Sequence, residues 1–170
     1  MLKLLADNAA LIAQRAGRPI EVAAVAARDR SRDRGVDLSR VAWADRAEEL
    51  ATMADLDVVV ELIGGSEGPA LALVEGALKA GRPVVTANKA LVAHHGTALA
   101  RAAEAAGTTF AYEAAVAGGI PAIKMLREGL AANGFSRIYG ILNGTCNYIL
   151  TTMRETGREF AEVLAEAQAL

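Results

Sequence analysis

Short apolar runs alternate with longer helical patterns through the middle of this 170-residue chain. The run DVVVELI at 57–63 is β-branched and apolar through its centre, and further runs lie at 83–86 and 108–113. Helical patterns separate these runs at 68–80 and 89–106. Continuous apolar character is typical of a buried parallel strand, and helices of this length connect parallel strands by right-handed crossovers. The alternation therefore predicts an α/β fold with a doubly wound, Rossmann-like parallel sheet.

The residues before this alternation fit the same architecture. The sequence predicts an amphipathic helix over 1–16, a short apolar strand over 21–27, a charged loop over 28–38 and a short helix over 46–53. A dinucleotide-binding domain of this class opens with a strand and a G-x-G-x-x-G turn, and neither precedes the first helix here. We therefore expect the sheet to lack its usual first strand and the sequence to be a fragment.

A domain boundary is predicted where the pattern changes, because Gly118, Gly119 and Pro121 interrupt the chain there. The prediction assigns a partial NAD(P)-binding domain to residues 1–118. Residues 119–170 would begin a second, α+β domain.

The second part contains a predicted helix at about 121–132, a strand at 137–143 and two further helical stretches up to Leu170. The strand runs into a group of small or polar residues, which are Asn143, Gly144, Thr145, Cys146 and Asn147. Two interpretations remain open for this group. It could present neutral donors and acceptors to a ligand, or Asn143 or Thr145 could cap the following helix.

Composition excludes several classes of partner. The 18 basic and 20 acidic residues nearly cancel, and no basic block with interleaved aromatic residues occurs, so nucleic acid is not expected. The apolar runs are short and interrupted, so no membrane span or export signal is expected. A single cysteine excludes an internal disulfide and fits a cytoplasmic location. Small metabolites are the expected ligands.

Ligands of a doubly wound sheet bind beyond the carboxyl ends of its strands. Arg28 follows the first predicted strand, where a dinucleotide domain places an acid for the ribose hydroxyls or an arginine for a 2′-phosphate. Arg28 therefore favours NADP, although with Asp29 and the neighbouring arginines it could also form a charged surface loop.

Glycines follow the DVVVELI strand, and Gly64 and Gly65 could let the backbone run against a cofactor or could form a simple turn. Glu61 at the end of the same strand could be functional. The alternative is a carboxylate bonded to neighbouring backbone.

Asn88 and Lys89 follow the next strand and open a helix. Asn88 suits the N-cap, whereas a lysine in the first turn opposes the helix dipole. Lys89 could therefore contact a phosphate, a carboxamide or a substrate oxygen, or it could be solvated.

Two further residues carry possible chemistry. Glu113 precedes the turn-prone segment AAVAGGIP, which could bind a hard cation through carbonyl oxygens, or Glu113 could hold a hinge through backbone N–H groups. Cys146 has no histidine nearby in sequence to activate it, so we expect a small buried cysteine rather than a nucleophile.

Four segments together resemble the homoserine dehydrogenase family, in that family's order: VVVELIGG (58–65), VVTANKALVA (84–93), YEAAVAGGIPAIK (112–124) and GILNGTCNYILT (140–151). The resemblance implies NADPH- or NADH-dependent interconversion of L-aspartate 4-semialdehyde and L-homoserine, on the route to threonine, methionine and isoleucine. It also implies a nucleotide-binding domain followed by a substrate and dimerisation domain, with a homodimer expected for the complete enzyme.

The resemblance also implies roles for individual residues. The cofactor would be bound by Arg28, Gly64, Gly65, Asn88 and Lys89, with Lys89 beside the nicotinamide and the substrate. A monovalent cation, Na⁺ or K⁺, would be bound by Glu113, Val116, Gly118 and Ile120. Residues near the substrate would be Gly144, Thr145 and Asn147.

The chain departs from the family pattern at both ends. The phosphate loop is missing, and so are a Gly-Tyr-Ala-Glu segment and a G-x-D-x-x-x-K pattern whose lysine is the family's proposed proton donor. We therefore expect the isolated chain to be inactive or nearly so. The alternatives are a non-catalytic fragment that binds nucleotide or pairs with another subunit, and a semialdehyde dehydrogenase that acylates Cys146.

Overall fold

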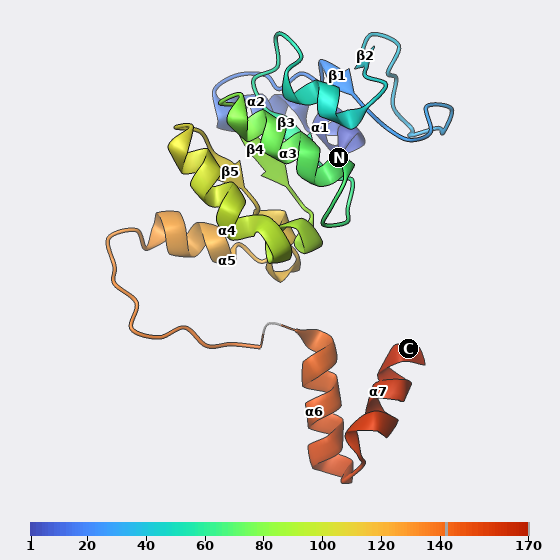
Figure 1. The fold of residues 1–170 in the computed structure, drawn as a ribbon, viewed down its shortest axis with the longest axis vertical. Helices are drawn as coiled ribbons and strands as arrows, with labels where there is room; N and C mark the ends of the chain where they lie inside the picture. Colours follow the sequence, from blue (N-terminus) through green and yellow to red (C-terminus); the bar gives the residue numbers. More distant parts are fainter. Residues whose placement is uncertain (142, 170) are drawn as a thin grey trace. The chain divides into compact units, whose positions relative to one another are not determined.

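The computed structural model describes residues 1–141 and 143–169 (Figure 1). These residues form two compact units, unit 1 over Met1–Lys124 and unit 2 over Met125–Leu170. In the described part of the chain, no helix is both long and apolar enough to cross a membrane.

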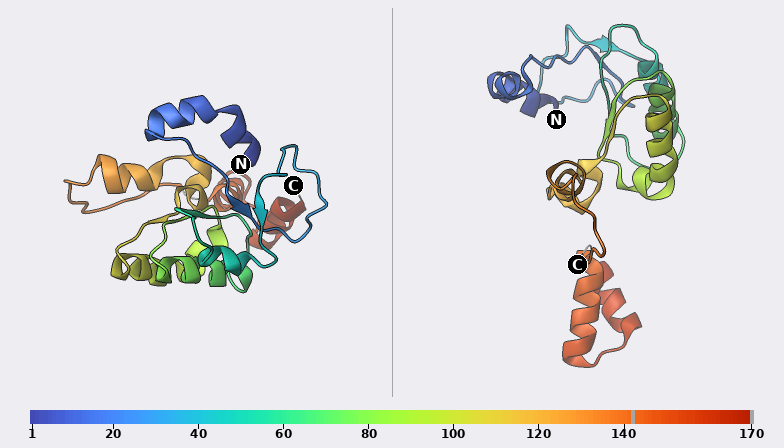
Figure 2. Two further views of the ribbon diagram at one scale, coloured as in Figure 1. Left: turned by 90° about the horizontal axis from the view of Figure 1, so that it is seen from above. Right: turned by 90° about the vertical axis from the view of Figure 1, so that its left-hand side faces the viewer.

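Every strand pairing described in unit 1 is parallel. β1 (Ala24–Val25) pairs with β2 (Ala42–Trp43), and β3 (Val59–Glu61), β4 (Val84–Thr86) and β5 (Phe110–Ala111) form a second sheet in that order. Helices lie on both sides of these strands (Figure 2). On one side are α1 (Leu2–Asp7) and α2 (Ala9–Ala16), and on the other are α3 (Pro69–Lys79) and α4 (Lys89–Ala105). The predicted α/β class with parallel strands is thereby confirmed.

The core of unit 1 lies between the three-stranded sheet and two long helices, α3 (Pro69–Lys79) and α4 (Lys89–Ala105). The helices contribute apolar residues at helical spacing, which bury one face of each helix. Burial of each large aliphatic side chain stabilises the fold by roughly 1.5–3 kcal/mol. The buried residues of this core include Leu73, Leu78, Val84, Leu91, Leu99 and Phe110.

The opposite face of this sheet is exposed, which differs from the expectation of strands buried on both faces. Val58, Val60 and Val85 are 47%, 39% and 41% exposed, whereas Val59 and Val84 are buried. Side chains alternate across a strand, and α3 and α4 cover one face of this sheet, so every second residue of its strands is buried. No residue of α1 (Leu2–Asp7) or α2 (Ala9–Ala16) is buried.

The first elements of the chain are shorter than the sequence predicts. The predicted helix over 1–16 breaks at Asn8, whose side-chain Nδ2 donates a 2.9 Å hydrogen bond to the carbonyl of Leu4. Side-chain bonds of this kind compete with the helical ladder. The end of the helix at Gly17 is confirmed, since Gly17 is left-handed with φ +75°.

Other elements of unit 1 are also shorter than predicted or of another type. The predicted strand over 21–27 is reduced to β1, and the helix predicted over 46–53 is the 3₁₀ helix η1 (Ala47–Ala51). The sequence did not predict β2. After β5 come two 3₁₀ turns, η2 (Glu113–Ala115) and η3 (Ala117–Gly119), and then the short helix α5 (Ala122–Lys124).

Unit 2 begins with the π-helical turn η4 (Met125–Gly129) and ends with α6 (Gly144–Thr156) and α7 (Phe160–Ala169). The helix predicted over about 121–132 is therefore interrupted. The strand predicted over 137–143 is wrong for 137–141 and 143, and Leu142 lies outside the described residues. A strand needs a hydrogen-bonded neighbour, and the described residues of unit 2 contain no strand.

Candidate functional site

The carboxyl ends of β3 and β4 are joined by a buried carboxylate. Glu61 and Thr86 are register partners in the sheet, and both side chains are fully buried. Thr86 Oγ1 donates a 2.5 Å hydrogen bond to Glu61 Oε2. The backbone N–H groups of Ile63 and Gly64 donate to Glu61 Oε1 over 2.6 and 3.2 Å. Glu61 therefore bonds neighbouring backbone, as the second of its two interpretations states, and holds the chain as it leaves the strand.

Asn88 connects this carboxylate to the start of α4. Its Oδ1 accepts a 3.1 Å bond from the N–H of Leu91, which confirms the predicted N-cap, and its Nδ2 donates to the carbonyl of Gly65 over 2.7 Å. The N–H of Asn88 donates to Thr86 Oγ1 over 3.0 Å. One side chain thus fixes both the glycine turn and the helix N-terminus.

The glycine turn is open to the approach of another molecule. Gly64 and Gly65 adopt φ +88° and +78°, which residues with a Cβ rarely adopt. A Cβ built at either glycine would meet nothing within 4 Å, so the glycines are required by backbone conformation and not by crowding. A turn, the alternative interpretation of these glycines, is observed, and it leaves their backbone accessible.

Lys89 is the first residue of α4 and is exposed. Its ammonium has no hydrogen bond or ion pair with any described residue. The backbone N–H groups in the first turn of a helix carry partial positive charge, so Lys89 adds a cation where anions bind favourably. A negatively charged or oxygen-rich ligand would interact favourably with both the helix N-terminus and the Lys89 ammonium.

Arg28 is exposed in a loop, residues 28–35, which we call the arginine loop. Its guanidinium has no partner among the described residues. Beside it, Asp29 Oδ1 accepts bonds from Ser31 Oγ and Ser31 N–H over 2.6 and 2.9 Å. These two bonds, the side-chain bond first, lower the pKa of Asp29 from its ordinary value of 3.8.

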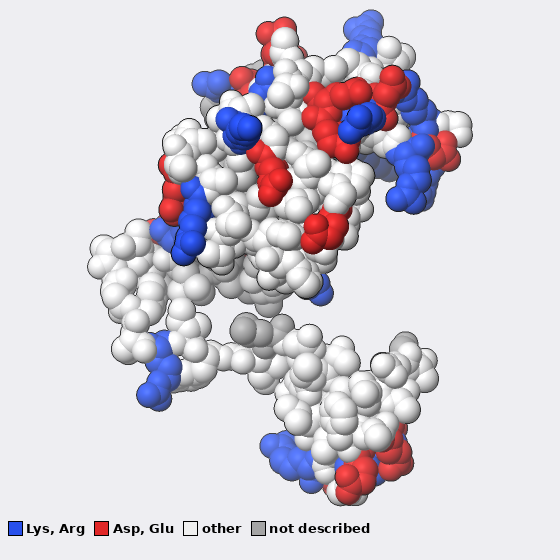
Figure 3. Space-filling view, viewed as in Figure 1, with Lys and Arg blue, Asp and Glu red and all other residues white. Residues whose placement is uncertain are grey.

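Two other arginines of this loop contact Trp43. The guanidinium carbons of Arg30 and Arg34 each lie 5.6 Å from the centre of the indole ring. Arg30 also pairs with Asp45, and Arg34 donates to the carbonyls of Asp29 and Arg32 over 2.5 and 2.7 Å. Basic and acidic side chains are interleaved over this corner of unit 1 (Figure 3).

Comparison with known proteins assigns the family. A family profile described as "Homoserine dehydrogenase, NAD binding domain" matches residues 1–113, and a second, "Homoserine dehydrogenase", matches residues 121–170. The chain belongs to the homoserine dehydrogenase family. The resemblance seen in the four sequence segments is thereby confirmed. The family is one of oxidoreductases.

Individual homoserine dehydrogenases support the same assignment. The protein of Pseudomonas aeruginosa is 52% identical over 167 residues, which cover 98% of this chain, and that of Corynebacterium glutamicum is 45% identical over 170 residues. A crystal structure from Thiobacillus denitrificans has a TM-score of 0.76 and 46% identity over 99% of this chain. A structure titled "Hyperthermophilic archaeal homoserine dehydrogenase in complex with NADPH" has a TM-score of 0.59 and 29% identity, and covers 72% of this chain. The chain spans 38% of the length of each of these four relatives.

Glu113 connects the two ends of the segment 113–124, where the family resemblance implies a cation site. Glu113 Oε1 and Oε2 accept hydrogen bonds from the N–H groups of Ile123 and Lys124 over 3.2 and 2.7 Å. The hinge interpretation of Glu113 is therefore correct for these two bonds. Each carboxylate oxygen retains further lone-pair capacity, so the bonds leave the carboxylate able to ligate a cation.

The backbone between Glu113 and α5 turns tightly. Val116 is extended, whereas Ala117 and Gly118 are left-handed with φ +54° and +60°. The N–H of Ala122 donates to the carbonyl of Ile120 over 2.7 Å. Among the described residues no group of three or more His, Cys, Asp or Glu side chains is arranged to bind a metal, so a cation here would depend on carbonyl oxygens.

At the start of α6, Asn143 acts as the helix cap. Its Oδ1 accepts a 2.9 Å bond from the N–H of Cys146, so one of the two interpretations of this group is observed. Three other residues, Gly144, Thr145 and Asn147, are exposed. Cys146 is also exposed, so the expectation of a buried cysteine is wrong. Among the described residues, its backbone N–H donates to Asn143 and its thiol has no hydrogen-bond partner.

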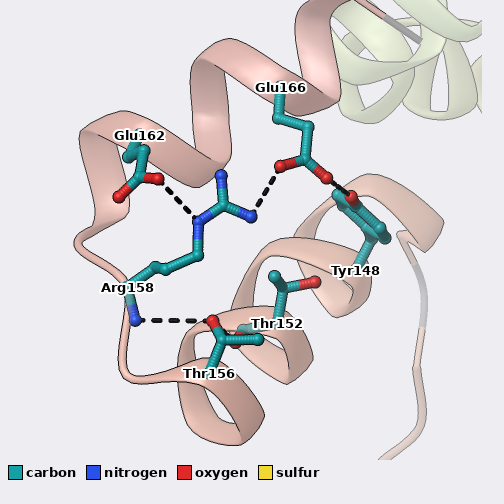
Figure 4. Close-up of polar contacts among 6 residues, drawn as sticks. All are labelled: Tyr148, Thr152, Thr156, Arg158, Glu162 and Glu166. Carbon is teal, nitrogen blue, oxygen red and sulfur yellow. Dashed lines mark hydrogen bonds and ion pairs between the residues drawn. The ribbon is translucent and has the colours of Figure 1, made fainter.

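The helices α6 and α7 are connected by a polar network (Figure 4). Arg158 donates to Glu166 Oε2 over 2.6 Å and to Glu162 Oε1 over 2.8 Å, and the Tyr148 hydroxyl donates to Glu166 Oε1. The Tyr148 bond, followed by that of Arg158, lowers the pKa of Glu166, while the Glu166 carboxylate raises the pKa of Tyr148. The network holds the helix that carries Gly144, Thr145 and Asn147.

Sequence reasoning missed two parts of this arrangement. It did not single out Thr86, although Glu61 and Thr86 are polar residues at equivalent ends of two apolar strands, which was a usable signal. It also missed Trp43. The strand that carries it, β2, is only two residues long, and Trp43 is placed beside the arginine loop only by the pairing of β2 with β1.

Proposed function

We propose that this chain provides the nicotinamide-nucleotide shell of a homoserine dehydrogenase, which interconverts L-aspartate 4-semialdehyde and L-homoserine. The observation that carries the proposal is the frame of Glu61, Thr86 and Asn88. This frame holds the open glycine turn and the N-terminus of α4 at one edge of a parallel sheet. A helix N-terminus and the exposed ammonium of Lys89 at such an edge suit a phosphorylated cofactor.

NADP is the proposed cofactor in preference to NAD. Arg28 presents an exposed guanidinium where a 2′-phosphate would lie, and a solved relative is described as a complex with NADPH. The Oδ1 atom of neighbouring Asp29 is already bonded to Ser31, which leaves this acid with less capacity to accept from ribose hydroxyls.

The reduced cofactor, when bound, supplies a hydride to the aldehyde carbon of the semialdehyde. This chain's contribution is to bind and orient. Gly64 and Gly65 let the backbone approach the cofactor, Asn88 fixes that turn, and Lys89 attracts an oxygen of the cofactor or of the substrate. Gly144, Thr145 and Asn147 would offer neutral hydrogen-bonding groups to the substrate.

A monovalent cation, Na⁺ or K⁺, is the second proposed ligand. Glu113 would contribute its carboxylate, while Val116, Gly118 and Ile120 would contribute carbonyl oxygens. A rise in thermal stability with KCl over choline chloride, lost on Glu113→Ala, is the expected result. The exposed Glu104→Ala in α4 is the matched control, and an equal response in both variants would exclude the site.

The remaining proposals concern the organisation of the complete enzyme. We place the change from nucleotide-binding to substrate and dimerisation domain between residues 118 and 119. A homodimer in the cytoplasm, active in threonine, methionine and isoleucine synthesis, is the proposed setting.

Direct binding and turnover measurements test the proposed function. NADPH is expected to bind the 170-residue chain, with negligible NADPH oxidation on addition of L-aspartate 4-semialdehyde, because these residues contain no G-x-D-x-x-x-K lysine. Absence of NADPH binding would refute the cofactor proposal. Turnover that disappears on Cys146→Ser would instead favour a thiol-dependent semialdehyde dehydrogenase.

A further inference from the structure

We propose that Trp43, together with Arg34, positions the arginine loop so that Arg28 and Arg32 receive the 2′-phosphate of the cofactor. The proposal rests on the proposed use of NADP. It assigns Trp43, which the sequence did not single out, as a positioning residue for cofactor specificity.

Trp43 lies where the loop leaves the sheet. It is the last residue of β2 and pairs with Val25, the last residue of β1, so its half-buried ring stands beside the beginning of the loop. A ring at this position can attract guanidinium groups through its electron-rich face. The 5.6 Å distances to Arg30 and Arg34 are within the range for this interaction.

Arg34 holds the shape of the loop from within. Its two terminal nitrogens donate to the carbonyls of Arg32 and Asp29, so one side chain connects both arms of the loop. Contact with Trp43 fixes the guanidinium that makes these bonds. Loss of the ring would therefore release the loop as well as Arg34.

The four arginines of the loop divide into two classes. Arg30 is paired with Asp45 and Arg34 is bonded to backbone, and both contact Trp43. Arg28 and Arg32 are exposed, and neither guanidinium has a partner among the described residues. Two uncommitted guanidinium groups on one short loop suit a phosphate dianion, which arginine binds through paired N–H donors.

Trp43 also provides the measurement, because it is the only tryptophan in the chain. Its fluorescence is expected to change on titration of the intact chain with 2′,5′-ADP. We expect 5′-AMP, which lacks the 2′-phosphate, to bind about tenfold more weakly. Arg28→Gln and Arg32→Gln should each reduce that preference, whereas Arg101→Gln, an exposed arginine of α4, should preserve it.

Calorimetric titration separates positioning from simple stability. Trp43→Leu is expected to reduce the preference for 2′,5′-ADP over 5′-AMP by about fivefold, and Trp43→Phe should restore most of it, since a phenyl ring keeps the cation–π contact. If the role of Trp43 were purely structural, Trp43→Leu would instead weaken the binding of both nucleotides equally and leave the ratio of their affinities unchanged.

The outcomes distinguish this inference from the proposed function. If the unmodified chain binds neither nucleotide, both the cofactor proposal and this inference fall. If it binds both nucleotides equally well, or if Trp43→Leu keeps the full preference for 2′,5′-ADP, this inference falls and dinucleotide binding stands.

Discussion

Thr86 Oγ1 donates a 2.5 Å hydrogen bond to Glu61 Oε2 and thereby joins the carboxyl ends of β4 and β3. The same hydroxyl accepts the N–H of Asn88, so a single oxygen connects the buried carboxylate to the residue that caps α4. A buried carboxylate is stable only where its oxygens are paired. Here the pairing also sets the positions of the glycine turn and of the helix N-terminus.

Replacement of this hydroxyl by a methyl group should destabilise unit 1. Thr86→Val removes the hydroxyl that donates to Glu61 Oε2 and accepts the N–H of Asn88, while the bonds to Glu61 Oε1 remain, so we expect a loss of about 1–3 kcal/mol in the free energy of unfolding. Thr108→Val is the matched control, since Thr108 Oγ1 is buried and has no partner among the described residues. Urea denaturation should show Thr108→Val unchanged or stabilised. Equal losses in the two variants would contradict the role of the Glu61 bond.

The glycine turn gives a conformational test. Gly65→Ala should destabilise the chain by about 1–2 kcal/mol, because an alanine is strained at φ +78° although its Cβ would meet no atom within 4 Å. Gly134→Ala, which also meets no atom within 4 Å and has no positive φ, should change stability little. Thermal unfolding compares the two variants. If Gly65→Ala leaves the stability unchanged, the backbone of the turn can adapt to a side chain at this position.

Lys89 should oppose stability while favouring the ligand. Lys89→Gln removes a cation from the first turn of α4 and should raise the free energy of unfolding by about 0.3–1 kcal/mol, while weakening NADPH binding. Lys79→Gln removes a cation from the last turn of α3, where it is favourable, and should lower stability by a similar amount without affecting NADPH. Denaturant titration and calorimetry measure the two effects. Unchanged NADPH affinity in Lys89→Gln would remove Lys89 from the cofactor site.

The network between α6 and α7 should make unit 2 sensitive to pH. Folding lowers the pKa of Glu166 from its ordinary value of 4.5, so its contribution is complete above that value and is lost as pH falls through the folded pKa. Folding raises the pKa of Tyr148 from 10.0, so that contribution is present below 10.0 and is lost as pH rises through the folded pKa. Stability is therefore greatest between these limits.

Hydrogen exchange across residues 144–169 checks this dependence. At pH 7, Glu166→Gln should exchange faster than the unmodified chain, and the difference should shrink as pH falls below 4.5. Comparison of variants at one pH removes the intrinsic pH dependence of exchange. Glu159→Gln, an exposed control on the same unit, should match the unmodified chain throughout. A pH-independent effect of Glu166→Gln would show that packing, not charge, holds the helices.

Features governed by neighbouring residues in sequence were predictable. The cap at Asn88, the left-handed end at Gly17 and the alternation of helices with apolar strands all depend on local backbone and side-chain preferences. The strand predicted over 137–143 is absent from the described residues of that range for the opposite reason. Its pattern was suitable, but a strand also requires a neighbour, which a local pattern does not supply.

The sequence by itself determined the α/β class, the family and the order of the candidate site residues, because alternation and motif strings are properties of the linear chain. The tertiary structure decided which of those residues meet. Only strand register places Thr86 against Glu61, and only the pairing of β1 with β2 brings Trp43 to the arginine loop. Such contacts depend on groups far apart along the chain, whose proximity comes from packing the sheet and its helices together.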